Sequence, residues 1–151
     1  VLGLQPLYRL GITEDIRGRL RSNKPNYRCI VAFSNPSNLA TKSETLVGTV
    51  ELGLRNQIMS KQIPYISNLA VLPEYRRQGI ARQLLLKCER IAFEWGFDEL
   101  SLHVLEDNLA AQQLYFSHGY QLQKVEHSLV SWLFKQPKRL YLAKQIDYLY
   151  S

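Results

Sequence analysis

The chain is poor in the residues and runs that mark several large classes of protein. It has two cysteines, Cys29 and Cys88, which lie far apart and form no CxxC pair. This argues against a zinc site or a disulfide framework and suits a reducing compartment. No apolar run reaches the ~20 residues that span a bilayer, so we expect no membrane partner. There is no charged-then-apolar leader, although a chain that starts at Val1 instead of Met is compatible with a removed transit peptide.

The bulk composition is that of one soluble globular domain. The 151 residues are 46% hydrophobic and 21% charged, and we expect a single domain over residues 1–151. The formal charge of +6 is a modest excess. This net charge is compatible with an anionic ligand, with nucleic acid or with a merely basic surface, and it does not distinguish among the three.

Hydrophobic periodicity predicts a mixed α/β (α+β) fold. The predicted strands span residues 4–10, 27–34, 45–55, 64–72, 98–105, 120–126 and 139–146. The predicted helices span residues 13–22, 80–95 and 109–118, the second stopped by Gly96 and the third capped by Asn108. The first strands follow one another directly, so we expect antiparallel pairing there. The apolar run over 129–134 is interpreted as a closing hairpin packed on the core.

One stretch carries unusual positive charge where a helix starts. Arg76, Arg77 and Arg82 surround Gly79, between a strand and the helix over residues 80–95. A helix N-terminus has unpartnered N–H groups and a positive dipole end, and glycine lets the backbone approach a phosphate. The stretch lacks the Lys-Ser/Thr of a P-loop and the three glycines of a dinucleotide fingerprint. It therefore favours a compact polyphosphate other than a nucleoside triphosphate or NAD, the alternative being arginines on an exposed loop.

Two motifs resemble the GNAT superfamily of N-acetyltransferases. "RRQGIA" (residues 76–81) matches the (Q/R)xxGx(G/A) signature, and "EDNLAAQQLYFSHGY" (106–120) is similar to the second signature of that family. The resemblance covers roughly residues 46–120 well and the ends more loosely. The tail "KQPKRLYLAKQI" (residues 135–146) and the long loop before "PYISNLAV" resemble the plastid and cyanobacterial branch, and the chain is more loosely similar to RimI-type N-terminal acetyltransferases. It implies a mostly antiparallel sheet of about seven strands, flanked by helices and splayed at the central strands to form an acetyl-CoA cleft.

The resemblance implies acetyl-CoA as co-substrate, no metal, and a set of binding residues. The loop and helix start would hold the CoA phosphates, the strand edge would hold the pantetheine arm and polarise the acetyl carbonyl, and Asn108 would contact the arm or serve only as a helix cap. The implied cofactor-binding residues are Leu69, Ala70, Val71, Arg76, Arg77, Gln78, Gly79, Ile80, Ala81, Arg82, Asn108 and Tyr115.

Three residues are candidates for proton transfer. Tyr115 matches the family tyrosine that protonates the departing thiolate, and its alternative is packing against the sheet. His103 occupies the position of the glutamate that serves as base in RimI-type enzymes, which puts that mechanism in doubt here; its alternative is a structural hydrogen bonder. Glu51 is the competing base, or else an exposed strand carboxylate.

The function expected from this resemblance is acetyl-CoA-dependent N-acetylation of a primary amine by direct attack. The acceptor is a protein N-terminal α-amine, a lysine or a small arylalkylamine, with residues 17–24, 55–63 and 128–138 expected to shape its site. A non-catalytic acyl-CoA-binding module is the alternative. We expect no nucleic-acid partner, because the arginines concentrate at one helix start instead of forming a stripe. We expect a monomer or homodimer in the cytoplasm, or in the plastid stroma if a transit peptide has been removed.

Overall fold

The computed structural model describes residues 25–34, 45–57 and 61–147. The strand predicted over 4–10 and the helix predicted over 13–22 lie outside these ranges. The elements in chain order are β1 (Tyr27–Ser34), β2 (Thr45–Asn56), β3 (Gln62–Val71), the 3-10 turn η2 (Pro73–Tyr75), α2 (Ile80–Glu94), β4 (Glu99–Leu105), α3 (Leu109–Ser117), β5 (Gln121–Glu126), α4 (Leu129–Leu133) and β6 (Arg139–Gln145). No helix in these ranges is both long and apolar enough to cross a bilayer.

The strands form one mixed sheet in the order β1-β2-β3-β4-β6-β5. Every neighbouring pair is antiparallel except β3 and β4, which are joined through α2 and run parallel. The predicted mixed, mostly antiparallel α/β fold is therefore confirmed. The described part of the chain supplies six strands where about seven were expected.

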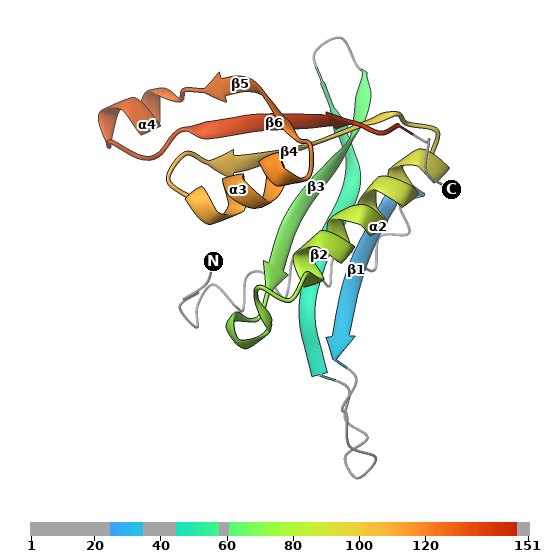
Figure 1. Cartoon of the computed structure of the whole chain (residues 1–151). Coiled ribbons are helices and arrows are strands. Elements are labelled where there is room, and N and C mark those ends of the chain that lie inside the picture. The colour runs from blue at the N-terminus through green and yellow to red at the C-terminus, as the bar shows by residue number, and fades with distance from the viewer. Residues whose placement is uncertain (1–24, 35–44, 58–60, 148–151) are drawn as a thin grey trace.

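The sheet is nearly divided between β3 and β4. Only Tyr65 with Ser101 and Ile66 with Leu102 are paired across this junction. The Ser101 hydroxyl adds a hydrogen bond to the Pro64 carbonyl at 3.3 Å. Beyond this point the two strands run apart, with β3 continuing toward the start of α2 and β4 continuing beside β6 (Figure 1). This is the predicted splay at the central strands.

Helix α2 covers one face of the β1–β3 half of the sheet (Figure 1). Its apolar face is buried as the periodicity predicts, through Leu84, Leu85, Cys88, Ile91 and Ala92. Burying side chains of this size contributes ~1.5–3 kcal/mol for each leucine or isoleucine, which fixes the helix on the sheet. The helix starts close to β2 because Gly48 has no side chain: a Cβ there would lie 3.1 Å from Ile80 Cγ2 and 3.2 Å from the Ala70 carbonyl.

Glu89 departs from the predicted pattern of α2. The helical periodicity assigns it to the polar face, yet the residue is only 8% exposed. Its carboxylate lies 2.8 Å from the Lys144 Nζ of β6, so the charge is buried together with a partner. A charge pattern along one helix cannot reveal a cation that arrives 55 positions later in the chain.

The predicted hairpin over residues 129–134 is wrong. Residues 129–133 form the short helix α4, in which Trp132 N donates to the Ser128 carbonyl at 3.1 Å. Its apolar side chains are not packed on the core, since Leu129 is 82% and Trp132 79% exposed. A short apolar run has no periodicity that separates strand from helix, which explains the error.

Candidate active site

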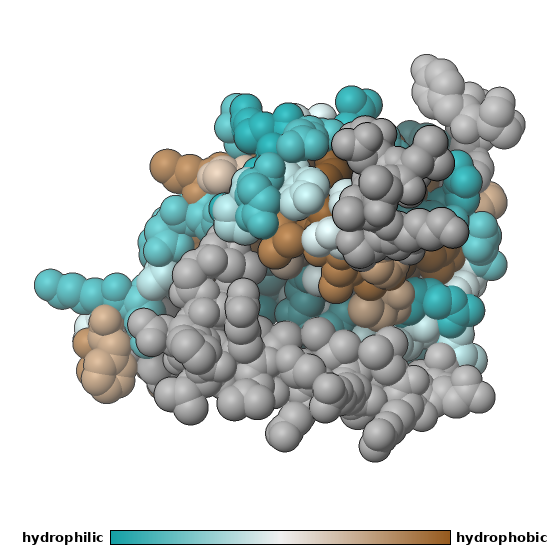
Figure 2. Space-filling view, turned by 90° about the horizontal axis from the view of Figure 1, so that it is seen from below, coloured by the Kyte–Doolittle hydropathy of each residue, from teal (hydrophilic) through white to brown (hydrophobic). Residues whose placement is uncertain are grey.

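A cavity of about 400 Å³ lies where β3 and β4 have separated. Its walls are the end of β3, the loop and first turn of α2, and α3. The described lining residues are Leu69, Ala70, Val71, Tyr75, Arg76, Arg77, Gly79, Ile80, Ala81, Arg82, Asn108, Ala110, Ala111, Leu114 and Tyr115. We call this the first cavity. Every residue of the predicted cofactor set except Gln78 lines it. Figure 2 views the molecule from below and shows apolar surface in the middle of this lower face, with hydrophilic side chains around it.

The start of α2 provides an anion-binding geometry at one end of the first cavity. Gly79 precedes the helix with φ of 81°, and no side chain caps the helix N-terminus. The first-turn N–H groups have no acceptor within the helix by its geometry. Arg77 also adopts a positive φ of 63°, and a Cβ at Gly79 would meet nothing within 4 Å. Arg76 is held in place by donating its Nε–H to the Val71 carbonyl at 3.1 Å.

The start of α3 faces the same cavity but is already capped. The Asn108 side-chain oxygen accepts from Ala111 N at 3.2 Å, as a helix cap does. Asn108 nevertheless lines the first cavity, so its amide remains at the surface that a ligand would contact. Two helix N-termini thus meet at this cavity, and only that of α2 is left without a side-chain cap.

Tyr115 is the buried phenol of the first cavity. Burial raises its pKa to about 12, with Tyr65 acting in the same direction, so the hydroxyl stays protonated throughout the physiological range. Its ring meets Tyr120 edge-on with centroids 5.8 Å apart. Tyr115 therefore packs in the core, as one reading predicted, and also lines the first cavity, while its role as proton donor to the thiolate stays a prediction.

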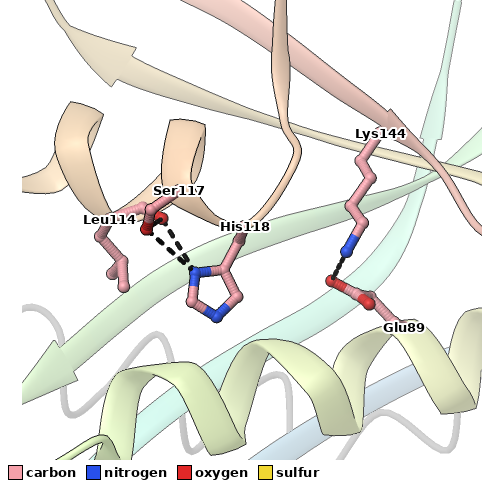
Figure 3. Close-up of polar contacts among 5 residues, drawn as sticks. All are labelled: Glu89, Leu114, Ser117, His118 and Lys144. Carbon is pink, nitrogen blue, oxygen red and sulfur yellow. Dashed lines mark hydrogen bonds and ion pairs between the residues drawn. The ribbon is translucent and has the colours of Figure 1, made fainter.

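The end of α3 is fixed by polar contacts beside this tyrosine (Figure 3). The Ser117 hydroxyl donates to the Leu114 carbonyl at 2.8 Å, and His118 Nδ1 lies 3.0 Å from the same carbonyl. Nearby, Lys144 reaches from β6 to Glu89 of α2 and lies over the Tyr120 ring (5.8 Å). The first two contacts close the end of α3, and the Lys144–Glu89 ion pair joins β6 to α2.

Strand β3 carries a bulge at Asn68. Ser67 pairs with Glu51 and Ala70 with Thr49, so two residues of β3 lie opposite one of β2. Asn68 has a φ of 53°, which is costly for a residue other than glycine and needs support from its surroundings. The Glu51 carboxylate provides it by accepting from Asn68 Nδ2 at 2.8 Å. Glu51 is 1% exposed, so the expectation of an exposed strand carboxylate is wrong.

A second cavity, of about 700 Å³, lies on the other side of the bulge. Its described lining residues are Pro25, Asn26, Tyr27, Glu51, Gly53, Leu54, Arg55, Gln62, Tyr65, Ser67, Asn68 and Arg139. Along β3, residues up to Asn68 line the second cavity and residues from Leu69 onward line the first. The bulge is therefore where the lining of one cavity gives way, along β3, to the lining of the other. Of the three loops predicted to shape the acceptor site, residues 55–63 contribute Arg55 and Gln62 to this cavity. Residues 128–138 contribute none of its described lining residues. Residues 17–24 lie outside the part of the chain that the structure describes.

His103 lies behind the second cavity and reaches it through Tyr65. The Tyr65 hydroxyl is 2.9 Å from His103 Nδ1, and Arg55 Nη1 is 3.3 Å from the same nitrogen. The Glu126 carboxylate is 3.2 Å from His103 Nε2. Nδ1 has one lone pair, and its acceptance of a hydrogen bond from the Tyr65 hydroxyl, the shorter of the two contacts, corresponds to the tautomer that carries its proton on Nε2. Burial lowers the pKa of His103, Glu126 opposes this, and Arg139 adds to it, so the ring is neutral at neutral pH.

Tyr65 was missed by the sequence reasoning. Nothing in the strand pattern "PYISNLAV" distinguishes it from a packing tyrosine, because its partner His103 is 38 residues away. Neither cysteine belongs to the site: both are free, and burial raises the pKa of Cys88 to about 12. Within the described ranges, no group of three His, Cys, Asp or Glu residues could hold a metal ion.

Known proteins with similar sequences and structures are acetyltransferases. A model of the acetyltransferase (GNAT) family matches residues 5–120. "GCN5-related N-acetyltransferase 10, chloroplastic" of Arabidopsis thaliana is 28% identical over 137 residues, covering 85% of this chain and 54% of its own length. The thialysine N-epsilon-acetyltransferase of Bos taurus is 39% identical over 108 residues, covering 72% of this chain and 64% of its own length.

Among solved structures, the fold is similar to that of the NatC complex bound to Gag peptide and CoA. The TM-score is 0.65 at 19% identity, with 97% of this chain and 84% of that chain covered. The chain thus spans about half the length of the Arabidopsis relative and most of the matched chain in the solved structure.

Proposed function

Because the chain belongs to the acetyltransferase (GNAT) family, we propose that it transfers the acetyl group of acetyl-CoA to a primary amine, with a protein N-terminal α-amine as its main acceptor. The observation that carries the proposal is the bulge of β3, where the lining of a cavity suited to a phosphorylated donor adjoins the lining of a second cavity. A two-substrate reaction needs two adjoining sites, with one substrate entering from each side.

The first cavity is the proposed donor site. The uncapped start of α2 and its arginines suit the CoA phosphates, and the unpaired edge of β3 suits the amide-bearing pantetheine arm. The backbone N–H of Leu69 or Ala70, beside the bulge, would donate to the acetyl carbonyl oxygen as negative charge develops there. The Tyr115 hydroxyl, protonated because burial raises its pKa, would donate to the sulfur as the C–S bond breaks.

The second cavity is the proposed acceptor site. The amine nitrogen attacks the carbonyl carbon, the new C–N bond forms, and the nitrogen must then lose a proton. Tyr65 is the polar group at this cavity that leads to a neutral imidazole, so we propose that the proton passes to the Tyr65 oxygen as the Tyr65 proton moves to His103 Nδ1. In this scheme Glu51 keeps the bulge in shape through Asn68. It remains the competing base.

The lowered pKa of His103 bears on the acceptor. An α-amine has a pKa of ~7.7–8.0 and a lysine ~10.4, so only the α-amine is partly neutral in ordinary conditions. A weakly basic imidazole suffices to take a proton from an α-amine and is poorly matched to the more basic amine of a lysine. This supports an N-terminal acceptor over a lysine, with a small arylalkylamine as the alternative that a cavity of about 700 Å³ also admits. A non-catalytic CoA-binding module would have no use for the Tyr65–His103 pair.

We extend the proposal to the whole chain and its location. Residues 1–151 would form one acetyltransferase domain. The names of the Arabidopsis relatives support a plastid location, and a cyanobacterial host would make the same protein cytoplasmic. Localisation of the full gene product fused to a fluorescent protein tests this point.

Thiol release from acetyl-CoA tests the function across N-terminal peptides, N-terminally blocked lysine peptides and small arylalkylamines. We expect the free N-terminal peptides to give the highest kcat/KM. In the Tyr115→Phe variant, kcat should fall at least about tenfold while CoA affinity is kept, because a single hydrogen bond to charge is lost. CoA binding without release from any amine would contradict the enzymatic proposal, and unchanged kcat would remove Tyr115 as the donor to sulfur.

A further inference from the structure

The second cavity has an excess of positive charge that proton transfer does not require. Arg55 and Arg139 both line it, whereas Glu51 is the one carboxylate among its described lining residues. Both arginines are exposed. Within the described part of the chain, neither guanidinium forms an ion pair with a carboxylate. An arginine without an anion at a ligand cavity is a candidate to bind one.

The carboxylate opposite Arg139 on the neighbouring strand is already engaged elsewhere. Glu126 lies opposite Arg139 in the β5–β6 register, but its carboxylate is directed to His103 Nε2 at 3.2 Å. The pKa values of Glu126 and His103 are changed most by burial and by the hydrogen bond between the two side chains. The charge of Arg139 lowers both pKa values by a smaller amount. Arg139 thus lines the cavity without an ion pair to any carboxylate of the described residues.

Arg55 is pre-oriented at the same place. Its guanidinium lies 4.6 Å from the centre of the Tyr65 ring, and its Nη1 is 3.3 Å from His103 Nδ1. Stacking on an aromatic face and one hydrogen bond hold the side chain and leave further N–H donors for a ligand. The cation therefore lies beside the group that would take the amine proton.

We propose that the acceptor carries a carboxylate close to its reacting amine, and that Arg55 and Arg139 recognise it. This rests on the proposed acetyl transfer. An extended peptide advances ~3.3–3.5 Å per residue, so a side chain at the second or third position can reach these arginines while its α-amine is at the bulge. The chemistry fits an acidic peptide N-terminus and also a free amino acid. A basic residue at the same positions is disfavoured by like-charge repulsion.

The test compares kcat/KM for matched peptides that differ only in having Asp, Asn or Lys at the second position. Asn is nearly isosteric with Asp, so that ratio isolates charge. We expect the Asp peptide to exceed the Asn peptide about three- to tenfold at low salt and the Lys peptide to fall below both. The ratio should shrink as NaCl is raised, because the arginines are exposed. Free glutamate and lysine form a second arm that separates a small-molecule acceptor from a peptide.

Arg139→Gln should reduce the Asp/Asn ratio toward one, and Arg139→Glu should reverse the order of the Asp and Lys peptides. Arg90→Gln is the matched control, since Arg90 is exposed on α2 and lines neither cavity. Equal kcat/KM for the Asp, Asn and Lys peptides, or an unchanged ratio in both Arg139 variants, overturns this inference and leaves acetyl transfer standing. Absence of thiol release with every acceptor would instead overturn the proposed function.

Discussion

Replacing Tyr65 by Phe removes one hydroxyl from the site and keeps the ring. The oxygen that is lost lies 2.9 Å from His103 Nδ1 and belongs to a residue that lines the second cavity, where it would connect the amine to the imidazole. The ring also keeps its place beneath the Arg55 guanidinium, at 4.6 Å. The substitution therefore tests the proton route with little change in packing.

The expected magnitude follows from what the pair has to do. General acid–base catalysis contributes ~10²–10⁴-fold, and the lower end applies because an α-amine is already partly neutral near pH 7. We expect kcat/KM for an N-terminal peptide to fall about a hundredfold, which is ~2.7 kcal/mol of barrier. Because Tyr65 and His103 would act as one unit, Tyr65→Phe/His103→Asn should be little slower than either single variant.

The pH profile gives a second, independent readout. Burial lowers the pKa of His103 below its ordinary value, so the imidazole is neutral above that pKa and loses its capacity to accept as the pH falls through it. Wild-type kcat should therefore show an acid limb below about pH 6.5, which His103→Asn removes.

Tyr141→Phe is the matched control for this experiment. The Tyr141 ring also contacts His103, with centroids 5.1 Å apart, but its hydroxyl bonds Gln57 at 2.7 Å. Steady-state kinetics on all four variants, with CoA affinity measured by calorimetry, separates catalysis from folding. A kcat/KM for Tyr65→Phe within about threefold of wild type would refute the Tyr65–His103 proton route. An equal loss of kcat/KM in Tyr141→Phe would refute it as well.

Two further substitutions probe the donor site and its support. Gly79→Ala should lower the free energy of unfolding by ~1 kcal/mol, because alanine disfavours the positive φ although its Cβ meets no clash. Gly79→Asp also brings a negative charge to the end of the cavity that would hold the phosphates, so it should weaken CoA binding at least about tenfold more than Gly79→Ala does. Equal CoA affinities of the two variants in calorimetry would argue against the anion site. Lys144→Met leaves the Glu89 carboxylate buried without its 2.8 Å partner and should lower the free energy of unfolding by ~2–3 kcal/mol in urea titrations. Adding Glu89→Leu should recover most of that loss, and no recovery would mean that the pair does not act as a unit.

Local signals in the sequence were enough to predict which residues gather at the first cavity. A strand, an arginine-rich loop, a glycine and an amphipathic helix follow one another directly, so residues 69–82 could be assigned as a unit, and all but Gln78 of the predicted set line one cavity. The acceptor side depends on contacts between distant positions. Tyr65 gains a role only through His103, and Asn68 only through Glu51 on the neighbouring strand. No periodicity along one segment encodes such pairs.

The near-division of the sheet between β3 and β4 has a consequence for the protein without its ligand. A six-stranded sheet ordinarily has two edges, but here the end of β3 and the end of β4 add two more in its interior, with backbone groups that no neighbouring strand among the described residues satisfies. Exposed strand edges are templates for pairing with other chains. A ligand in the first cavity that forms backbone-like hydrogen bonds would cover the β3 edge. Bound acetyl-CoA would therefore reduce self-association of the protein as well as take part in the reaction.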